Sequence, residues 1–212
     1  AICGASCDFF INDIPQKIWQ SYKVKAGDII KIGKILIGQR VYLAVKNGFD
    51  IPKEFGSNAT TLKEELGGLN GNKISNNDFL PYEEYEGWFN YRLQDKFIPK
   101  YDEDILTLRV LLSYQENSFP NQEKEKFFNS IYTITSDFNR MACKLSGEVI
   151  KSDLDGIISE GISFGSIQIP QDGQPIILLK ERQTIGGYPK IGSVINIDCF
   201  KLAQRKIGTK IR

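Results

Sequence analysis

The residues best suited to chemistry lie between positions 165 and 190, where two strand-like apolar runs are broken by polar, glycine-bearing turns. The second turn places the run from Glu181 to Thr184 beside the pair Gly186 and Gly187. Hydrogen-bonding side chains there surround a backbone that can approach a ligand closely. This pattern predicts a small-molecule site. A plain hairpin, whose glycines serve the turn and whose Tyr188 packs on the core, also fits the residues.

One residue type is missing altogether, because the sequence contains no histidine. Its absence excludes Ser-His and Cys-His nucleophile pairs and every imidazole metal ligand. The four cysteines are too few for a disulfide scaffold and lack the spacing of a zinc site, so no metal site is expected. The available chemistry therefore rests on carboxylates, Lys, Arg, Tyr, Thr and backbone amides.

A second polar cluster follows Pro52. Residues 56–61 combine a glycine turn with several hydroxyls and an amide, which suits hydrogen bonding to a carboxylate or phosphate. Ser57 and Thr60 are the candidate binding side chains. The alternative is an ordinary turn capped by Ser and Thr.

A third cluster is Asn139-Arg140-Met141, at the edge of a predicted strand. Arg140 could bind a carboxylate or phosphate through two parallel hydrogen bonds. A structural ion pair with Asp137 or with Glu160 is equally compatible with the sequence.

Charge and hydropathy limit the partners. The chain has 212 residues, of which 27 are basic and 26 acidic, and its net charge is +1. This balance gives no electrostatic reason to expect nucleic acid or an anionic membrane. No apolar run approaches the ~20 residues of a membrane span. The sequence therefore predicts a soluble, cytoplasmic protein of one large or two small domains.

The elements that position these residues are mostly strands. Apolar alternation predicts short strands from Lys23 to Leu36 and, after Gly38-Gln39-Arg40, from Val41 to Val45. Turn residues then recur at a spacing typical of β-barrels or sandwiches rather than βαβ units. Residues 81–101 are aromatic and charged, which indicates a connector, and the stretch from Tyr82 to Tyr91 could serve a protein partner.

A second domain is expected to begin near residue 104, which divides the chain into 1–103 and 104–212. It opens with a strand from Ile105 to Leu112 and a short helix from Asn121 to Ser130, whose first turn is acidic. Further strands are predicted at Tyr132–Thr135, Ala142–Leu145, Ser166–Ile169, Ile176–Leu179 and Ser193–Ile197, and a short helix at Phe200–Arg205.

Two nucleotide and cofactor motifs are excluded. Residues 27–34 resemble a Walker A loop only superficially, because the glycine spacing is wrong and Ile35 stands where Ser or Thr must hold magnesium. A biotin carrier needs its modified Lys beside Met, and the only Met, Met141, is followed by Ala142. This chain is therefore not expected to carry covalent biotin.

Several spaced motifs, in order, resemble one known family. Segments at 42–45, 56–60, 67–71 and 139–141 match it, as do Ser159-Glu160-Gly161, the run 165–170, Asp172-Gly173-Gln174-Pro175, and Arg182-Gln183-Thr184 with Gly186-Gly187-Tyr188-Pro189-Lys190. On these residues the chain resembles the biotin-dependent carboxyltransferase-related family, also called allophanate hydrolase subunit 2-like, which includes the C subunit of bacterial 5-oxoprolinase.

The resemblance implies a mainly β fold, made of tandem cyclophilin-like β-barrel domains with a few short helices. Residues 1–103 would form the remainder of the first barrel plus a connector, with an N-terminal part of the usual protein missing. Residues 104–212 would form the second barrel.

The resemblance also implies a function as one subunit of an ATP-dependent 5-oxoprolinase, which opens 5-oxo-L-proline to L-glutamate. The implied partners are an allophanate hydrolase subunit 1-like protein and a third, metal-dependent lactam hydrolase subunit. ATP with Mg²⁺ would be shared with the partner subunit. The alternatives are a urea or acyl carboxyltransferase-like subunit and a regulatory module that antagonises a kinase inhibitor.

Under this resemblance, each candidate residue has an expected role. Backbone amides near Gly186 and Gly187, with two basic side chains, are expected to hold anionic groups, while polar side chains orient the amide. A positive φ at Gly187 is the basis on which Gly187→Val would be strained. The catalytic candidates are Arg140, Gln183, Thr184 and Tyr188, and the substrate- or phosphate-binding candidates are Ser57, Thr60, Asn139, Gly186, Gly187 and Lys190.

The chain departs from the family pattern at three places. Glu181 stands where the family has Asp, Ile185 where it has Thr, and Ala142-Cys143-Lys144 where it has Gly-aromatic-Arg. Lys144 lacks the planar guanidinium fork and Ile185 lacks a hydroxyl. These positions are therefore expected to bear on the choice of substrate.

Overall fold

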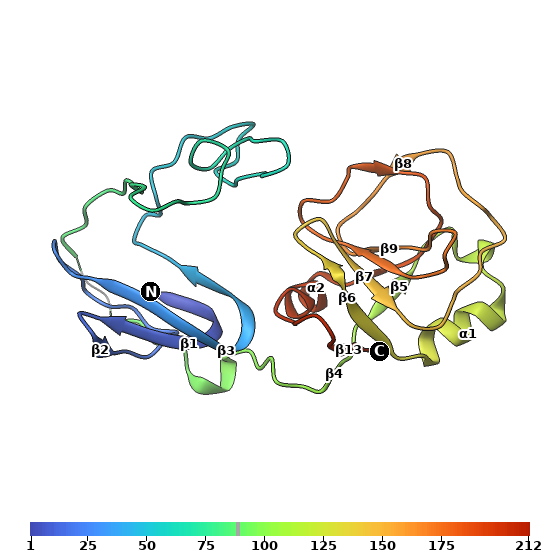
Figure 1. Cartoon of the computed structure of the whole chain (residues 1–212), viewed down its shortest axis with the longest axis horizontal. Helices are drawn as coiled ribbons and strands as arrows, with labels where there is room; N and C mark the ends of the chain where they lie inside the picture. Colours follow the sequence, from blue (N-terminus) through green and yellow to red (C-terminus); the bar gives the residue numbers. More distant parts are fainter. Residues whose placement is uncertain (88–89) are drawn as a thin grey trace. The chain divides into compact units, whose positions relative to one another are not determined.

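The computed structural model describes residues 1–87 and 90–212. Trp88 and Phe89, which belong to the aromatic connector proposed as a partner surface, lie outside the described residues. The chain folds as two compact units (Figure 1). Unit 1 comprises residues 1–36 and 41–99, and unit 2 comprises residues 37–40 and 100–212. The predicted division into cyclophilin-like domains at residues 103 and 104 stays a prediction.

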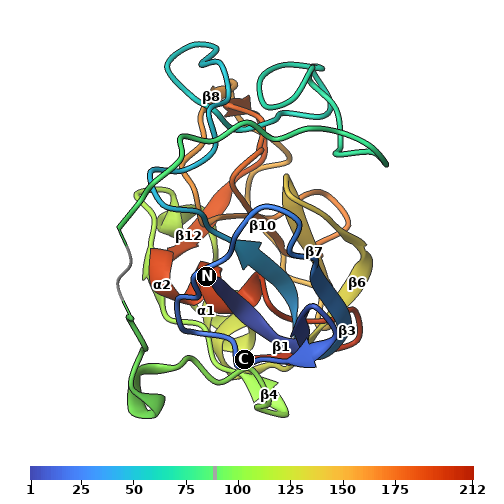
Figure 2. The same ribbon diagram turned by 90° about the vertical axis from the view of Figure 1, so that its left-hand side faces the viewer.

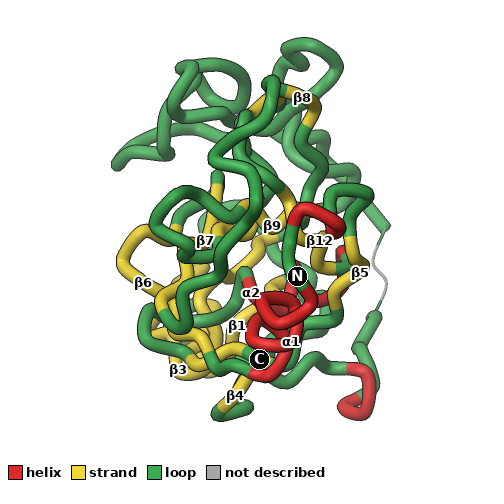
Figure 3. The backbone as a smooth tube through the Cα atoms, turned by 90° about the vertical axis from the view of Figure 1, so that its right-hand side faces the viewer, coloured by secondary structure: helices red, strands yellow, loops and turns green. Residues whose placement is uncertain are grey.

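Unit 1 is built on a three-stranded sheet in the order β2-β1-β3 (Figure 2). Its strands are β1 (Ile2–Ile11), β2 (Ile14–Pro15) and β3 (Ile30–Leu43). Strands β1 and β2 form a tight hairpin, because Asn12 and Asp13 both take the positive φ that such a turn requires. Beyond β3, the described part of the unit is turns, bridges and one 3-10 helix, η1 (Asp95–Phe97), as the loop colouring in Figure 3 shows.

The two separate strands predicted at Lys23–Leu36 and Val41–Val45 are wrong, because a single strand, β3, starts at Ile30 and runs through Gly38-Gln39-Arg40 without a break. Gly38 has a φ of 94° inside the strand. The side-chain oxygen of Gln204 accepts hydrogen bonds from the backbone N–H groups of Gln39 (2.9 Å) and Arg40 (2.8 Å), and its amide donates to the Arg40 carbonyl (3.0 Å). Gln204, although distant in the sequence, therefore provides hydrogen-bond partners for the β3 backbone at the point where a break between two strands was expected.

Unit 2 is built on an eight-stranded sheet in the order β4-β13-β6-β7-β10-β9-β12-β5, with a separate two-stranded ribbon, β11-β8. The strands of the large sheet are β4 (Ile105–Leu106), β5 (Val110–Leu112), β6 (Tyr132–Phe138), β7 (Ala142–Ser146), β9 (Ser166–Gln168), β10 (Ile176–Leu178), β12 (Lys190–Val194) and β13 (Lys210–Ile211). The ribbon consists of β8 (Glu160–Gly161) and β11 (Ile185–Gly186), and the helices are η2 (Glu116–Ser118), α1 (Asn121–Asn129) and α2 (Asn196–Leu202).

The large sheet must curl into a half-barrel because of its connections. The single strand predicted from Ile105 to Leu112 is wrong, because it is divided into β4 and β5, which lie at opposite edges of the sheet. Only residues 107–109 join them, and the step from Leu106 to Val110 spans at most about 14 Å. The two edges therefore come close together, which a flat sheet of this width could not allow. Figure 1 shows the resulting curl, with α1 at one side of it.

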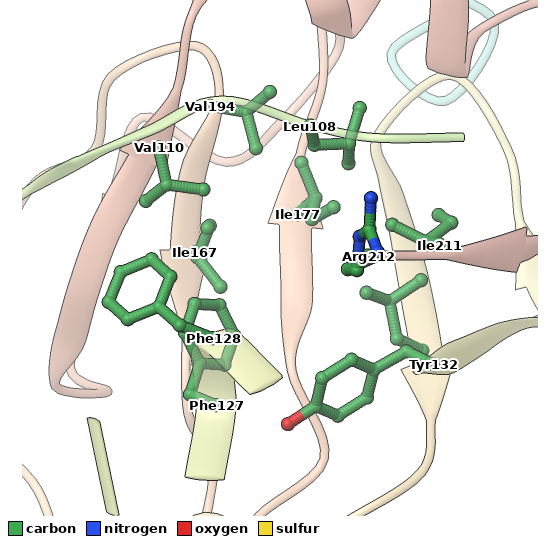
Figure 4. Close-up of a pocket in the computed structure, with 11 residues that line it drawn as sticks. Leu108, Val110, Phe127, Phe128, Tyr132, Ile167, Ile177, Val194, Ile211 and Arg212 are labelled. Atoms are coloured by element: carbon green, nitrogen blue, oxygen red, sulfur yellow. The ribbon is translucent and has the colours of Figure 1, made fainter. Parts of the chain in front are cut away.

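The core of unit 2 lies inside this curl. Buried apolar residues of β6, β7, β9, β10 and β12 form one cluster, which includes Ile134, Cys143, Ile167 and Ile177. A cavity of about 40 Å³ remains within it. Figure 4 shows apolar side chains from several strands, with Phe127 and Phe128 of α1, converging on that cavity. The prediction of a mainly β, barrel-like fold with a few short helices is confirmed.

The C-terminal helix begins earlier than the sequence predicted. The expected strand at Ser193–Ile197 ends at Val194, and the expected helix at Phe200–Arg205 is α2, which starts at Asn196. Buried Asp198 in its first turn accepts hydrogen bonds from the backbone N–H (2.9 Å) and the guanidinium of Arg109 (2.9 and 3.0 Å). This tertiary pairing, rather than a capping side chain, fixes where the helix starts.

Among the described residues, no helix is both long and apolar enough to cross a membrane.

Candidate functional site

Strand register brings two polar side chains together inside unit 2. Gln168, at the end of β9, lies opposite Lys190, at the start of β12. The register then shifts between Lys190 and Gly192, so β12 carries one extra residue at this point. Such bulges re-aim side chains and often lie beside functional sites. Here the bulge leaves both Lys190 (5% exposed) and Ile191 (0%) buried.

The buried ammonium of Lys190 is paired with Glu160 of the β8–β11 ribbon. The Tyr114 hydroxyl also donates to the Glu160 carboxylate, and the Gln115 amide donates to it at 2.8 Å. The Gln115 oxygen in turn accepts the backbone N–H of Lys190 at 2.8 Å. The segment after β5, the ribbon and β12 thus meet in one polar cluster.

The cluster holds a fixed pair of opposite charges. Hydrogen bonds from Lys190 and Tyr114 lower the pKa of the Glu160 carboxyl group. The hydrogen bond to Glu160 raises the pKa of the Tyr114 phenol. At neutral pH, Glu160 is therefore a carboxylate and Tyr114 a proton donor to it. The arrangement can orient a polar ligand and stabilise a charge that develops on it.

The two glycines of the predicted site lie at the ribbon, where Gly186 pairs with Glu160 and Ile185 with Gly161. Figure 1 shows this ribbon at the end of unit 2 away from the C-terminus. A Cβ atom added to Gly186 would lie 2.9 Å from the Gln168 amide nitrogen and 2.6 Å from Ile162 Cδ1. Gly186 therefore packs closely against two flexible side-chain ends, and its expected approach to a ligand stays a prediction.

The positive φ expected at Gly187 is wrong, because Gly187 is not among the glycines with that conformation. Its carbonyl accepts the Ile157 N–H at 2.8 Å, and a Cβ added to Gly187 would lie 3.0 Å from the Ile157 carbonyl oxygen. The lack of a side chain at Gly187 thus serves the approach of a neighbouring strand-like segment, so the strain argument for Gly187→Val does not hold.

Arg140 pairs with neither of the partners that the sequence suggested. Its guanidinium lies 2.6 Å from the Glu181 carboxylate, although this contact lacks the angles of a hydrogen bond. The backbone explains the pairing, because the Glu181 N–H donates to the Arg140 carbonyl at 2.9 Å in continuation of the β7–β10 ladder. Half of the Arg140 side chain remains exposed. It can therefore still contact an anion.

The remaining candidates of unit 2 lie around this site at the surface. Asn139 is a turn residue, whose side-chain oxygen accepts the Met141 N–H at 2.7 Å. Gln183 and Thr184 are exposed, and neither side chain hydrogen-bonds to another described residue. Tyr188 is also exposed and interacts electrostatically with Lys144, whose ammonium binds Asp172 at 2.7 Å.

Ser57 and Thr60 belong to unit 1. The Ser57 hydroxyl accepts the Ala59 N–H at 3.1 Å, and the Ser57 backbone exchanges two 2.9 Å hydrogen bonds with Glu54. A Cβ added to Gly68 would collide with the Thr60 hydroxyl. Both side chains therefore lie in tight local turns, and their proposed role in binding an anion stays a prediction.

Within unit 2, the structure thus brings together Lys190 and Gly186, and it adds residues that sequence reasoning missed. Those residues are Gln168, Tyr114 and Gln115, with Glu160 in a role other than the one considered. No clear signal for Gln168 was available in the sequence, because Ser166 and Gln168 alternate with Ile167 and Ile169 as in a half-exposed strand, whereas in the structure Gln168 is buried. A polar side chain at a core position requires a partner or a function. Nothing in the sequence indicated that Tyr114 and Gln115, which follow β5, lie beside Glu160.

Within residues 1–87 and 90–212, no three His, Cys, Asp or Glu side chains lie together in a way that could hold a metal ion by protein ligands alone. Magnesium bound with ATP needs only one or two carboxylates, because phosphate oxygens and water supply its other ligands. The expected ATP with Mg²⁺ therefore stays a prediction.

Comparison with known proteins places the whole chain in one group. The family described as "Carboxyltransferase domain, subdomain A and B" matches residues 1–212. The chain is 32% identical over 217 residues to the C subunit of Escherichia coli 5-oxoprolinase, covering 100% of this chain and 67% of that protein. The corresponding protein of Haemophilus influenzae is 32% identical over 213 residues, with the same coverage.

Longer fungal proteins and solved structures are also similar. A putative urea carboxylase of Emericella nidulans is 29% identical over 226 residues, which are 100% of this chain and 18% of that protein. The crystal structure of the Kluyveromyces lactis urea carboxylase matches all of this chain at a TM-score of 0.91 and 23% identity. The chain spans only 21% of that structure, so the likeness concerns the fold.

Proposed function

Because the chain belongs to the carboxyltransferase domain family of subdomains A and B, we propose that it works as one subunit of an ATP-dependent 5-oxoprolinase. The observation that carries the proposal is the 32% identity to the C subunit of 5-oxoprolinase over the whole of this chain. The proposed reaction is the opening of 5-oxo-L-proline. Its lactam C–N bond breaks, water adds oxygen to the carbonyl carbon and hydrogen to nitrogen, and L-glutamate forms in the cytoplasm.

The lactam amide is a poor electrophile, which sets what the protein must do. ATP would transfer its terminal phosphoryl group to the amide oxygen and leave as ADP, and the group would depart as phosphate when water adds to the carbonyl carbon. We infer that ATP and its Mg²⁺ are shared with an allophanate hydrolase subunit 1-like partner. A third, metal-dependent lactam hydrolase subunit would complete the assembly.

This chain would then bind and polarise the amide. The buried Lys190 ammonium can stabilise negative charge on the amide oxygen, and Glu160, Tyr114 and Gln115 hold that ammonium in place. A donor aimed at a developing charge is worth about 3 kcal/mol, or about 10² to 10³ in rate. Burial of the Lys190 side chain increases its effect, because water screens the ammonium less.

The exposed candidates would contact the rest of the substrate. Arg140 keeps half of its side chain free to bind an anionic group beside Glu181. Gln183, Thr184 and Tyr188 border the ribbon and would orient the ring. Arg140→Ala and Gln183→Ala are each expected to lower turnover at least tenfold without unfolding the chain, since each loses a charged or polar contact to the substrate.

The experiment uses the full-length protein assembled with its partner subunits. ATP hydrolysis that depends on added 5-oxo-L-proline, with release of glutamate, would support the proposal. Gln171→Ala, an exposed glutamine of the β9–β10 turn, is the matched control and should leave turnover unchanged. Tight partner binding without any turnover would favour a regulatory module instead.

A second candidate is carboxyl transfer to urea. It is favoured by the fungal relative named a putative urea carboxylase, which matches all of this chain. The same assay distinguishes the two functions. Urea-dependent ATP hydrolysis that requires biotin would replace the 5-oxoprolinase proposal, whereas turnover of 5-oxo-L-proline without biotin would exclude it.

A further inference from the structure

Four buried side-chain atoms of unit 2 have no hydrogen-bond partner among the described residues, and Gln168 Nε2 is the one that lies within a strand of the large sheet beside Lys190. The Gln168 side chain is 6% exposed, and its amide nitrogen, Nε2, has no hydrogen-bond partner among residues 1–87 and 90–212. Buried donors are almost always satisfied, because leaving one unpaired is unfavourable. An unpaired amide donor at this position in the sheet indicates that a ligand accepts its hydrogen bond.

The surroundings of Gln168 are those of a polar binding site. Lys190 lies opposite it in the strand register and carries the ammonium that pairs with Glu160. The Gly186 backbone packs closely against Nε2, because a Cβ added there would lie 2.9 Å from it. A neutral amide donor thus lies beside a buried cation and beneath the backbone of the β8–β11 ribbon.

The β8–β11 ribbon, whose Gly186 lies against Gln168, has a short hydrogen-bond ladder. The β8–β11 ribbon pairs only two residues of each strand. It is extended by one backbone hydrogen bond, from the Ile162 N–H to the Thr184 carbonyl at 2.9 Å, and Arg182 Nε donates to the Ile162 carbonyl at 2.9 Å. A shift of the ribbon would let a small ligand reach Gln168, and it would open this short ladder together with the Glu160 contacts to Lys190 and Gln115.

We propose that Gln168 recognises the N–C=O edge of a small amide, with Nε2 donating to the amide oxygen and Oε1 accepting the amide N–H. A five-membered lactam holds its N–H and C=O on the same edge, and urea presents the same edge. The carboxamide of glutamine offers the complementary donor and acceptor side by side. The Lys190 ammonium would lie near the same oxygen. This inference rests on the proposed function and names how its substrate class is selected.

The test measures direct binding of 5-oxo-L-proline and of urea to the assembled complex by titration calorimetry. Gln168→Met keeps the length of the side chain and removes both hydrogen bonds, so binding should weaken at least tenfold. Gly186→Ala keeps the glutamine, but its new Cβ would lie 2.9 Å from Nε2 and displace the amide, with a similar loss expected.

The matched control is Gly161→Ala on the same ribbon, where an added Cβ would meet no atom within 4 Å. Its binding should stay within about twofold of the wild-type value, since no contact changes. Thermal unfolding of each variant shows whether the fold is retained. Should Gln168→Met fail to fold, Gly186→Ala carries the test alone, because only flexible side-chain ends must move.

A lactone analogue, in which ring oxygen replaces the N–H, tests the acceptor separately. The wild-type complex should bind the lactone at least fivefold more weakly than the lactam. The Gln168→Met complex should bind the lactone at least as tightly as the lactam. Wild-type complex that binds neither 5-oxo-L-proline nor urea would refute the proposed function. Wild-type complex that binds one of them, with Gln168→Met and Gly186→Ala binding equally well, would refute the role of Gln168 alone.

Discussion

The two units use apolar strands in different ways. In unit 2, residues such as Ile134 and Ile177 are 1% exposed and lie in one continuous core. In unit 1, the long strand β3 leaves Ile32 42% and Leu36 49% exposed. Both sets of residues show the same apolar pattern in the sequence. The comparison teaches that alternation predicts a strand, whereas the burial that stabilises it depends on what lies across from its face.

The largest expected difference between the units is the cost of truncating an isoleucine. Ile134→Ala in β6 should lower the free energy of unfolding by about 4 kcal/mol, because it opens a cavity in a closed core. Ile32→Ala in β3 should cost less than about 1 kcal/mol, since nearly half of that side chain is already in water. Urea unfolding followed by circular dichroism measures both. Equal losses would contradict the comparison.

Two glycines with positive φ give the next largest contrast. Gly165 of unit 2 has a φ of 89°, and an added Cβ would lie 2.3 Å from the Val194 carbonyl oxygen. Gly56 of unit 1 has a φ of 79°, but its added Cβ would meet no atom within 4 Å. Gly165→Ala should therefore destabilise by about 3 kcal/mol and Gly56→Ala by about 1 kcal/mol.

The same denaturation measurement applies to the glycine pair. A larger loss for Gly56→Ala than for Gly165→Ala would show that packing around Gly165 is looser than the structure indicates.

The smallest effect concerns acid stability. Hydrogen bonds from Arg109 lower the pKa of Asp198 in unit 2, and those from Asn12 and the Lys25 N–H lower that of Asp28 in unit 1. A folded pKa below the ordinary value of 3.8 means that the unfolded chain binds the proton more readily. Each carboxylate thus contributes stability above that pH, which is lost as the pH falls through the folded pKa.

The matched variants are Asp198→Asn and Asp28→Asn, with denaturation midpoints measured between about pH 3 and pH 6. Asp198→Asn should flatten the decline in stability at acid pH more than Asp28→Asn, because Asp198 is buried and Asp28 lies in an exposed turn. A steeper decline in either variant would contradict the sign of the pKa shift.

Much of unit 2 was predictable because its signals are local. Strands β6, β7, β9 and β10 begin at the residues that the apolar runs predicted, and α1 spans Asn121–Asn129 where its acidic first turn and following Phe residues indicated a helix. The spaced motifs also identified the family. Each of these features depends on a few neighbouring residues, which is the range over which hydrophobic periodicity and turn residues determine local structure.

The candidate site was predictable only in part. Gly186 and Lys190 were expected from the glycine-bearing turn and the family motif, and both lie in the polar cluster. Gln168 and Tyr114 were missed, because their proximity depends on the bulge in β12 and on the segment that follows β5. The partner of Arg140 was also missed, since the β7–β10 register sets it.

The sequence by itself determined the mainly β character, the starts of β6, β7, β9 and β10, and a chemistry without histidine. Only the tertiary structure decided that Gln204 keeps β3 continuous and that Lys190 pairs with Glu160 beside an unpartnered Gln168. The physical reason is distance along the chain. Local patterns fix the conformation of a segment, whereas strand register and sheet curl fix which distant side chains meet.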